Sequence, residues 1–528
     1  MTDTNSFPCK FLLVGFDGLR PCDITPDVMP NLARFRDESH TWENYLASFP
    51  TETYVNHPVI FSGFRPNGHG LIANSFYCPE LKGKAQLFCG WDTESVIAQD
   101  EARPEGLYAV PDMAELLAQK GKTMRVLCAN SAGSTRLQNM HADRYPGHLN
   151  ACIHALEEAI PIDERNRLLQ HRPATMPLTF PDFAAQSEML DILFRDELNN
   201  GVQNLADMTV FWIGEPDHSS HEIGLKSELT ERARTHADKL FGRIYDWWLK
   251  EGRSRNVQLV TMSDHGHGEI AGHVDFAGIL RQAGCTVVTD QEILGGADPN
   301  EAEMVLVGDY TAGLWVKDNS VENLTRIAQI LTSDPSVGLV FSQPNEQYRD
   351  AVAGRVPGTL SEALVFSESV RGPDLRIVGR GDNSTGRILS GGHYSLGCGN
   401  HGGLTPAELH AHLSCAGTAF TQQTRRHKAP AGHDDLAKTM LTLMGAEANH
   451  SPARVLDEAL KDDGDESYGV FTLRLSQGKL SMTIEHAHYA GRRYVLSGER
   501  EDGALPAFNT VWNWDVGAEF RISIKKPE

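Results

Sequence analysis

Acidic and imidazole side chains recur in short clusters along this 528-residue chain. Carboxylates and imidazoles are the side chains that bind zinc and similar divalent metals in proteins. Asp217 and His221 are four residues apart, so a helical turn would place both on one face. The clusters are Asp17, Phe49–His57, Glu215–His221, Ser263–Gly266 and Gly399–Gly403.

Each cluster also has a simpler structural interpretation. Asp17-Gly18 could be a turn after a strand, Thr53 could cap a helix, and His401 could be a polar loop residue. Asp217 and His221 could equally be a solvated pair on a helix. The joint occurrence of all five clusters in one chain, several of them at strand ends, favours a shared metal site.

The elements around these clusters predict an α/β fold. Apolar runs at 11–16, 124–129, 209–213 and 257–262 each end in polar residues, which is typical of strands buried on both faces. Helical patterns at 113–121 and 227–252 lie between them. We therefore expect a central, mostly parallel sheet flanked by helices, with the chemistry at the carboxyl ends of its strands.

Three regions are predicted along the chain. Residues 1–290 and 391–460 form the core, with two helices expected at Pro406–Ala416 and His433–Met444. Residues 291–390 break the alternation and are interpreted as an inserted α+β cap subdomain. Residues 461–528 alternate with period two and predict a C-terminal β-rich extension.

Composition and charge exclude some classes of protein. The chain has 48 Lys and Arg against 70 Asp and Glu, a net charge of −22, which argues against binding to nucleic acid polymers. An anionic substrate would then need a local positive centre, such as a metal. The start of the chain, Met1–Lys10, lacks the pattern of a secretory signal. The sequence contains no apolar run long enough to predict a membrane span. The nine cysteines are scattered, without a Cys-x-x-Cys pair, and predict reduced thiols and a cytoplasmic location.

The clusters and their order resemble the alkaline phosphatase superfamily, and within it the nucleotide pyrophosphatase/phosphodiesterase (type I phosphodiesterase) branch, which is related to phosphonoacetate hydrolase. The resemblance covers about Phe11–Leu460 and implies an alkaline phosphatase-like core with an inserted cap. It rests on Pro50–His57 (PTETYVNH), Ser62-Gly63, His69-Gly70, Asn74–Tyr77, Glu-Pro-Asp-x-x-x-His at 215–221, Ser-Asp-His-Gly at 263–266 and Asn-His-Gly-Gly at 400–403.

The resemblance implies two metal sites and a threonine nucleophile. Asp217, His221 and His401 would hold one ion. Asp17, Asp264 and His265 would hold the other, with the Thr53 oxygen beside it. Thr53 rather than Thr51 matches the family's nucleophile, and Asn74 matches the residue that hydrogen-bonds a phosphoryl oxygen. The mixture of Asp and His favours two Zn²⁺ ions, with Mn²⁺ or Fe as alternatives.

Several neighbouring residues are set aside. His57 is interpreted as structural or as support for the ligands, and His218 is expected to point away from Asp217 on a helix. His267 and His273 could suggest a compact histidine site, but the resemblance requires only His265. Ser62 is the poorer nucleophile because it lies beyond the motif position.

The predicted function is a metal-dependent hydrolase that cleaves phosphodiester or pyrophosphate bonds through a phospho-threonine intermediate. The alternatives are a phosphonate hydrolase of the phosphonoacetate type and a phosphomonoesterase. A non-catalytic binding protein is disfavoured, because it would be expected to lose ligands. The expected partner is a small anionic phosphate ester or phosphonate, which Lys82 and Lys84 could contact. The β extension is compatible with a homo-oligomer.

Overall fold

The computed structural model describes residues 8–172, 175–347, 351–446, 451–461 and 466–502, and the backbone of 520–525. Its centre is an eight-stranded sheet in the order β21-β2-β20-β9-β1-β8-β6-β7. The five strands from β9 to β7 are parallel, whereas β20 is antiparallel to β9. The strands are β1 Lys10–Phe16, β2 His40–Trp42, β6 Met124–Ala129, β7 Leu149–Cys152, β8 Met208–Ile213, β9 Val257–Ser263, β20 Leu413–Ala416 and β21 Arg426–His427. The predicted α/β fold with a mostly parallel sheet is confirmed.

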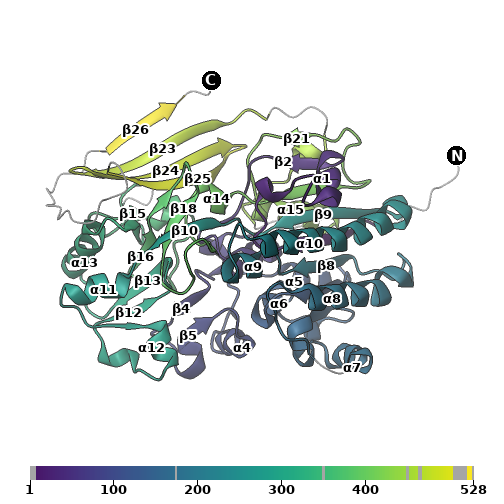
Figure 1. The fold of residues 1–528 in the computed structure, drawn as a ribbon, viewed down its shortest axis with the longest axis horizontal. Coiled ribbons are helices and arrows are strands. Elements are labelled where there is room, and N and C mark those ends of the chain that lie inside the picture. The colour runs from purple at the N-terminus through teal and green to yellow at the C-terminus, as the bar shows by residue number, and fades with distance from the viewer. Residues whose placement is uncertain are drawn as a thin grey trace.

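Helices cover both faces of this sheet because its strands are apolar on both sides. Leu12 and Val14 of β1 face a core shared with three helices, α1 Pro30–Asp37, α8 Phe183–Asp196 and α10 Glu228–Trp247. Phe11 and Leu13 face the opposite core, with α2 Thr53–Ser62, α5 Met113–Ala118 and α15 His433–Leu443. Figure 1 shows α8 and α10 lying along the central strands. Among the helices of the described residues, none has the length and apolar character required to cross a bilayer.

The register of the parallel strands brings the predicted site residues together. Phe16, the last residue of β1, is paired with Ile213 at the end of β8 and with Ser263 at the end of β9. The next residues along each strand therefore emerge side by side at the carboxyl edge of the sheet. Asp17 follows β1, and Asp264 follows β9. Strand β8 is followed by the loop that leads into helix α9 (Asp217–Glu222).

A second sheet of six strands lies beside the central one, in the order β11-β12-β13-β16-β14-β15 (Figure 1). It begins slightly before the predicted cap and occupies most of residues 291–390. Its strands are β11 Val287–Thr289, β12 Met304–Val307, β13 Thr311–Val316, β14 Val337–Ser342, β15 Leu360–Ser361 and β16 Leu375–Gly379, with helices α11 Phe276–Gln282, α12 Asp290–Leu294 and α13 Val321–Ser333. A small sheet joins it to the core through β10 Gly268–His273, β17 Gly381–Asp382, β18 Arg387–Ser390 and β19 Gly399–Asn400.

One predicted helix is wrong. The segment Pro406–Ala416 forms only a single helical turn, α14 Pro406–Leu409, and then becomes strand β20. Thr405 and Glu408 form a capping box at the start of this turn. Beyond this turn, Leu413–Ala416 pairs antiparallel with β9 in the central sheet, and the chain extends.

The C-terminal extension folds as antiparallel strands, as its period-two pattern predicts. The strands are β23 Gly469–Gln477, β24 Leu480–Tyr489, β25 Arg492–Glu501 and β26 Phe520–Lys525. Leu475 and Ile484 pack into the same apolar cluster as Phe341 of the second sheet. The N-terminal segment 1–7 and, within the extension, residues 462–465, 503–519 and 526–528 lie outside the described residues.

Arg376 forms a buried ion pair within the second-sheet region and a hydrogen bond to the core. Arg376 Nε of β16 lies 3.0 Å from Glu362 Oε1, and both side chains are buried. Arg376 Nη1 also donates to the carbonyl of Ile72, 3.0 Å away, in the core. We predict that Arg376→Ala lowers the free energy of unfolding by about 3–5 kcal/mol, because Glu362 loses its partner but stays buried.

Urea denaturation of the wild-type and variant proteins would measure this loss. The matched control is the double variant Arg376→Met with Glu362→Leu, which removes both charges and keeps most of the volume. We expect this double variant to be more stable than Arg376→Ala. Equal stability of the two would contradict the assignment of the loss to an unpaired buried charge.

Candidate active site and metal centre

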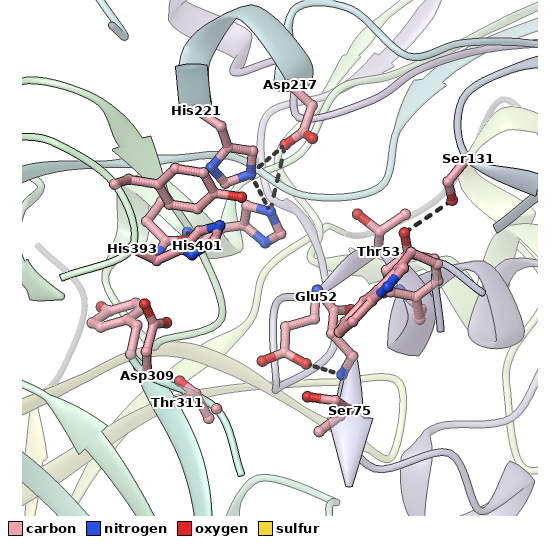
Figure 2. A pocket seen from close by; sticks show the side chains of 18 of the residues that line it. Glu52, Thr53, Ser75, Ser131, Asp217, His221, Asp309, Thr311, His393 and His401 are labelled. Carbon is pink, nitrogen blue, oxygen red and sulfur yellow. Dashed lines mark hydrogen bonds and ion pairs between the residues drawn. The ribbon is translucent and has the colours of Figure 1, made fainter. Parts of the chain in front are cut away.

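A pocket of about 870 Å³ opens at the carboxyl edge of the central sheet, between the core and the second sheet. Thr53, Asn74, Asp217, His221 and His401 line it from the core side, all of them predicted site residues. Figure 2 shows Asp217, His221 and His401 converging at one side of this pocket, with Asp309, Thr311 and His393 opposite Thr53. Among the described residues, no lysine or arginine lines the pocket.

Four buried side chains meet in the first cluster. Asp217 and His221 lie on one face of helix α9, as their spacing predicts, with His221 Nε2 3.2 Å from Asp217 Oδ1. His401 follows β19, and its Nε2 lies 3.1 Å from His221 Nε2 and 3.4 Å from Asp217 Oδ1. His267, just before β10, adds its Nε2 at 3.0 Å from the same Asp217 oxygen.

These contacts set the protonation of Asp217. Burial alone would raise the pKa of its carboxyl group, but the neighbouring His221, with contacts from His267 and His401, holds that pKa well below its usual range. Burial would lower the pKa of His221, whereas the charge of Asp217 raises it above its ordinary value. A carboxylate surrounded by imidazoles is a typical set of zinc ligands.

The second cluster forms where β1 and β9 end. Asp264 Oδ2 lies 3.3 Å from His265 Nε2, and Asp17 Oδ1 lies 3.7 Å from the same nitrogen. Trp212 Nε1 donates to Asp17 Oδ2 at 3.0 Å, and Asn130 also donates to that oxygen. Gly15 makes room for this indole, because a Cβ there would lie 2.0 Å from Trp212 Cε3.

The acids of this centre fit divalent ions. Burial, followed by the charges of neighbouring carboxylates, raises the pKa of Asp17 and of Asp264 well above the usual range. Asp217 Oδ1 and Asp264 Oδ2 are buried and have no hydrogen-bond partner within the described part of the chain. Three desolvated carboxylates, two of which have an unpaired oxygen, require positive charge beside them. The residues present therefore fit a metal centre.

Thr53 is the first residue of α2, where backbone N–H groups are not bonded within the helix. Its Oγ1 lies 3.1 Å from His265 Nε2 and 3.5 Å from Asp17 Oδ1. Asn74 Oδ1 accepts a hydrogen bond from the Tyr54 N–H, 3.0 Å away, so the NH₂ end of the Asn74 side chain is the end left for a ligand. Thr53 and Asn74 therefore border the same part of the pocket.

Glu52 fixes the position of Asn74 relative to Thr53. It is buried, and its carboxylate accepts a hydrogen bond from the backbone N–H of Asn74. Burial raises the pKa of Glu52 to about 7. In the sequence, the only indication that Glu52 lies at the site is its position directly before Thr53 in the Pro-Thr-Glu-Thr motif.

The structure also locates the residues that were set aside. His57 Nε2 lies 3.7 Å from Asp264 Oδ2 and 3.9 Å from Asp17 Oδ2, so His57 contacts both acids of the second cluster. Ser62 donates its hydroxyl to the carbonyl of Pro58, within its own helix, and does not line the pocket. Lys82 and Lys84 are exposed and outside the pocket lining, and Lys84 pairs with Glu94.

Two further histidines behave differently from each other. His218 points away from the first cluster and bonds Asn130 Oδ1 at 3.1 Å, as expected from its position on the helix. His267 is part of the first cluster, although it is set aside on the sequence alone, because the neighbouring His265 already satisfies the motif. The available signal was the spacing Asp-His-Gly-His at 264–267.

Comparison with known proteins identifies a family. The family model of type I phosphodiesterase/nucleotide pyrophosphatase matches residues 11–354. Bis(5′-adenosyl)-triphosphatase of Homo sapiens is 38 % identical over 271 residues, 50 % of this chain and 48 % of the relative. The same-named protein of Xenopus laevis is 37 % identical over 101 residues, 19 % of this chain and 22 % of the relative. The chain thus spans at most about half the length of these curated relatives.

Solved structures share the fold. Murine ectonucleotide pyrophosphatase/phosphodiesterase 5 gives a TM-score of 0.55 at 16 % identity, covering 86 % of this chain and 100 % of that chain. A structure of an inactive form of the murine protein in complex with AMP gives 0.54 at 16 % identity, covering 86 % and 99 %. The human protein gives 0.54 at 17 % identity, with the same coverage. These neighbours extend the similarity in fold beyond the part matched by the family model.

Proposed function

Because this chain belongs to the type I phosphodiesterase/nucleotide pyrophosphatase family, we propose that it hydrolyses phosphodiester or pyrophosphate bonds of small substrates, with Thr53 as nucleophile. One observation carries the proposal: the Thr53 hydroxyl lies 3.1 Å from His265 Nε2 and 3.5 Å from Asp17 Oδ1, at the floor of the pocket. A hydroxyl beside a cluster of metal-binding groups can be activated as a nucleophile by a metal bound there.

Two divalent ions are part of the proposal. Asp217, His221 and His401 would hold one, and Asp17, Asp264 and His265 would hold the other beside Thr53. The mixed Asp and His ligands favour zinc, with manganese or iron as alternatives. When bound, the ions would lower the pKa of the Thr53 hydroxyl and offset negative charge on the phosphoryl oxygens.

The chain's own groups then carry the displacement. Thr53 Oγ1 loses its proton and bonds to phosphorus, while the bond from phosphorus to the leaving oxygen breaks and that oxygen takes up a proton. Water later breaks the bond between Oγ1 and phosphorus and returns a proton to Thr53. The N-terminus of α2 and the Asn74 NH₂ group would stabilise the charge that develops on the phosphoryl oxygens.

The pocket favours a diester over a phosphonoacetate-type substrate. Asp290, Asp309 and Glu222 line it, and no lysine or arginine of the described residues does. A leaving group with its own carboxylate would therefore meet further negative charge. A diester or pyrophosphate with an uncharged leaving portion, such as a nucleoside, suits this lining better.

The test compares kcat/KM of the metal-loaded protein on bis(p-nitrophenyl) phosphate, p-nitrophenyl phosphate and phosphonoacetate. We expect the diester to be the best of the three, and we expect bis(5′-adenosyl) triphosphate to be cleaved as well. A preference for the monoester would favour a phosphomonoesterase instead. Release of phosphate from phosphonoacetate alone would overturn the proposal in favour of a phosphonate hydrolase.

Asn74→Asp is predicted to lower kcat/KM by about 10²–10³-fold, the usual loss when one donor to a developing negative charge is removed. The aspartate keeps an oxygen for the Tyr54 N–H but replaces the donating NH₂ group with a second acceptor. Steady-state kinetics on the diester would measure the loss, and thermal unfolding would check that the fold is intact. An unchanged kcat/KM would contradict the assigned role.

The cytoplasmic location and the homo-oligomer stay predictions. Cell fractionation with an antibody to the chain would test the location. Light scattering of the purified protein would test the oligomer by giving its mass in solution.

A further inference from the structure

We propose that His267 is a fourth protein ligand of the first metal ion, so that Asp217, His221, His267 and His401 hold it together. The inference rests on the metal centre of the proposed function and goes beyond it. Both the motifs and the family resemblance assign only three ligands here. The fourth would give the two metal sites different numbers of protein ligands.

The distances fit a tetrahedral ion. Zinc bonds of about 2.0–2.1 Å at tetrahedral angles put the ligand atoms about 3.3–3.4 Å apart. Asp217 Oδ1 lies 3.0 Å from His267 Nε2, 3.2 Å from His221 Nε2 and 3.4 Å from His401 Nε2. The nitrogens of His221 and His401 are themselves 3.1 Å apart. His267 therefore lies as close to the shared carboxylate oxygen as the two predicted ligands do.

The other ring nitrogen of each histidine is already used. Nδ1 of His267 donates to the carbonyl of Gly18 at 2.9 Å. Nδ1 of His221 donates to Gly399 and Nδ1 of His401 to Thr51, at 2.9 and 2.7 Å. In a neutral ring this leaves Nε2 as an acceptor with an exposed lone pair. A backbone partner on the second nitrogen is the usual arrangement for a histidine that binds a metal.

Hydrogen bonds do not pair all of these atoms. When the three rings are neutral, three Nε2 lone pairs and a carboxylate oxygen face one another in a buried space, and groups that only accept repel each other. His267 Nε2 and Asp217 Oδ1 have no hydrogen-bond partner within the described residues. A cation at the centre of the four atoms would satisfy all of them at once.

Two glycines keep the His267 ring in this position. A Cβ on Gly18 would lie 2.2 Å from His267 Cε1, and one on Gly399 would lie 2.8 Å from His267 Cδ2. Gly18 also has a φ of +64°, which a residue with a side chain rarely adopts. The backbone therefore packs directly against the imidazole and limits its rotation away from Asp217.

The consequence is a division of roles between the sites. Four protein ligands are typical of tightly held zinc. The second site has three such ligands, Asp17, Asp264 and His265, beside Thr53. We infer that the ion held by His267 binds more tightly and exchanges more slowly than its neighbour.

The experiment measures metal binding, without depending on turnover. The full chain is loaded with zinc and titrated with a chromophoric chelator, and the retained zinc is counted by mass spectrometry. The variants are His267→Ser and His267→Cys, which are similar in size, although only a thiolate binds zinc well. The control is His273→Ala, an exposed histidine of strand β10 outside both clusters.

Wild type and His273→Ala are expected to hold two zinc ions, one of them more tightly. His267→Ser should weaken the tight site by about 100-fold or more, and His267→Cys should restore much of that affinity. Cobalt in the tight site should give the strong visible absorption of four-coordinate Co²⁺, weakened in the serine variant.

Equal zinc affinities of wild type and His267→Ser would overturn this inference and leave the proposed function intact. So would equal losses in the serine and cysteine variants, since packing rather than ligation would then explain both. A wild-type chain that binds no divalent metal would overturn the metal centre, and with it the proposed function.

Discussion

Thr53→Ala is expected to lower kcat on bis(p-nitrophenyl) phosphate by about 10⁴–10⁶-fold, the range seen when a covalent nucleophile is removed. The Thr53 hydroxyl is the group at the start of α2 that contacts both His265 and Asp17. Without it, the metal centre and Asn74 could still bind substrate, so KM should change far less than kcat. Stopped assays on both proteins at matched metal content would measure the two constants.

Two companion variants sharpen this test. Thr53→Ser keeps a hydroxyl and should recover much of the lost rate. Ser62→Ala removes the other aliphatic hydroxyl of the same helix, which donates to the carbonyl of Pro58, and should retain most of the activity. Acid quenching during turnover, followed by mass spectrometry, should find the phosphoryl adduct on the peptide that holds Thr53. Full activity of Thr53→Ala would disprove the covalent mechanism.

Removal of divalent metal is expected to abolish turnover and to lower the thermal stability of the protein. Asp17, Asp217 and Asp264 are buried within one centre, and their charges repel one another when no cation lies between them. Zinc that binds only the folded chain adds about 2.7 kcal/mol of stability at a concentration of about 100 times its dissociation constant. Dialysis against a chelator, and then against zinc or manganese, should remove and restore both properties.

The Thr53→Ala protein provides the control for this experiment. Its acids and histidines are intact, so its melting temperature should still fall on chelation and rise with added zinc, although it has no turnover to lose. A melting temperature that does not respond to metal in either protein would contradict the metal centre.

The edge of the central sheet could be predicted because its determinants are local. Apolar runs such as those of β1 and β9 specify buried strands by composition alone, and the polar residue after each run marks where the strand ends. Parallel pairing then aligns these ends, so Asp17 and Asp264 meet without any further information. The spacing of four residues between Asp217 and His221 is also a local feature, and both residues lie in helix α9.

Other features depend on contacts between distant segments. Strand β20 forms because Leu413–Ala416 pairs with β9, whereas its own short pattern fits a helix equally well. His267 joins the first cluster because the antiparallel pair Gly268 and Asn400 brings β10 beside β19, and thereby beside His401. The order of the six strands in the second sheet is similarly set by pairing, and no motif in the sequence encodes it.

The anchoring of the C-terminal sheet determines how much chain the catalytic part needs in order to fold. Asp434 of α15 pairs with Arg65, just after helix α2, and with Arg492 of β25. The apolar face of the tail completes the cluster around Phe341. A fragment cut after Leu460 would lose one of the two arginines and expose that cluster to water. We therefore expect the core, second sheet and tail to fold as one cooperative unit, and expression fragments intended for crystallography should retain the last strands.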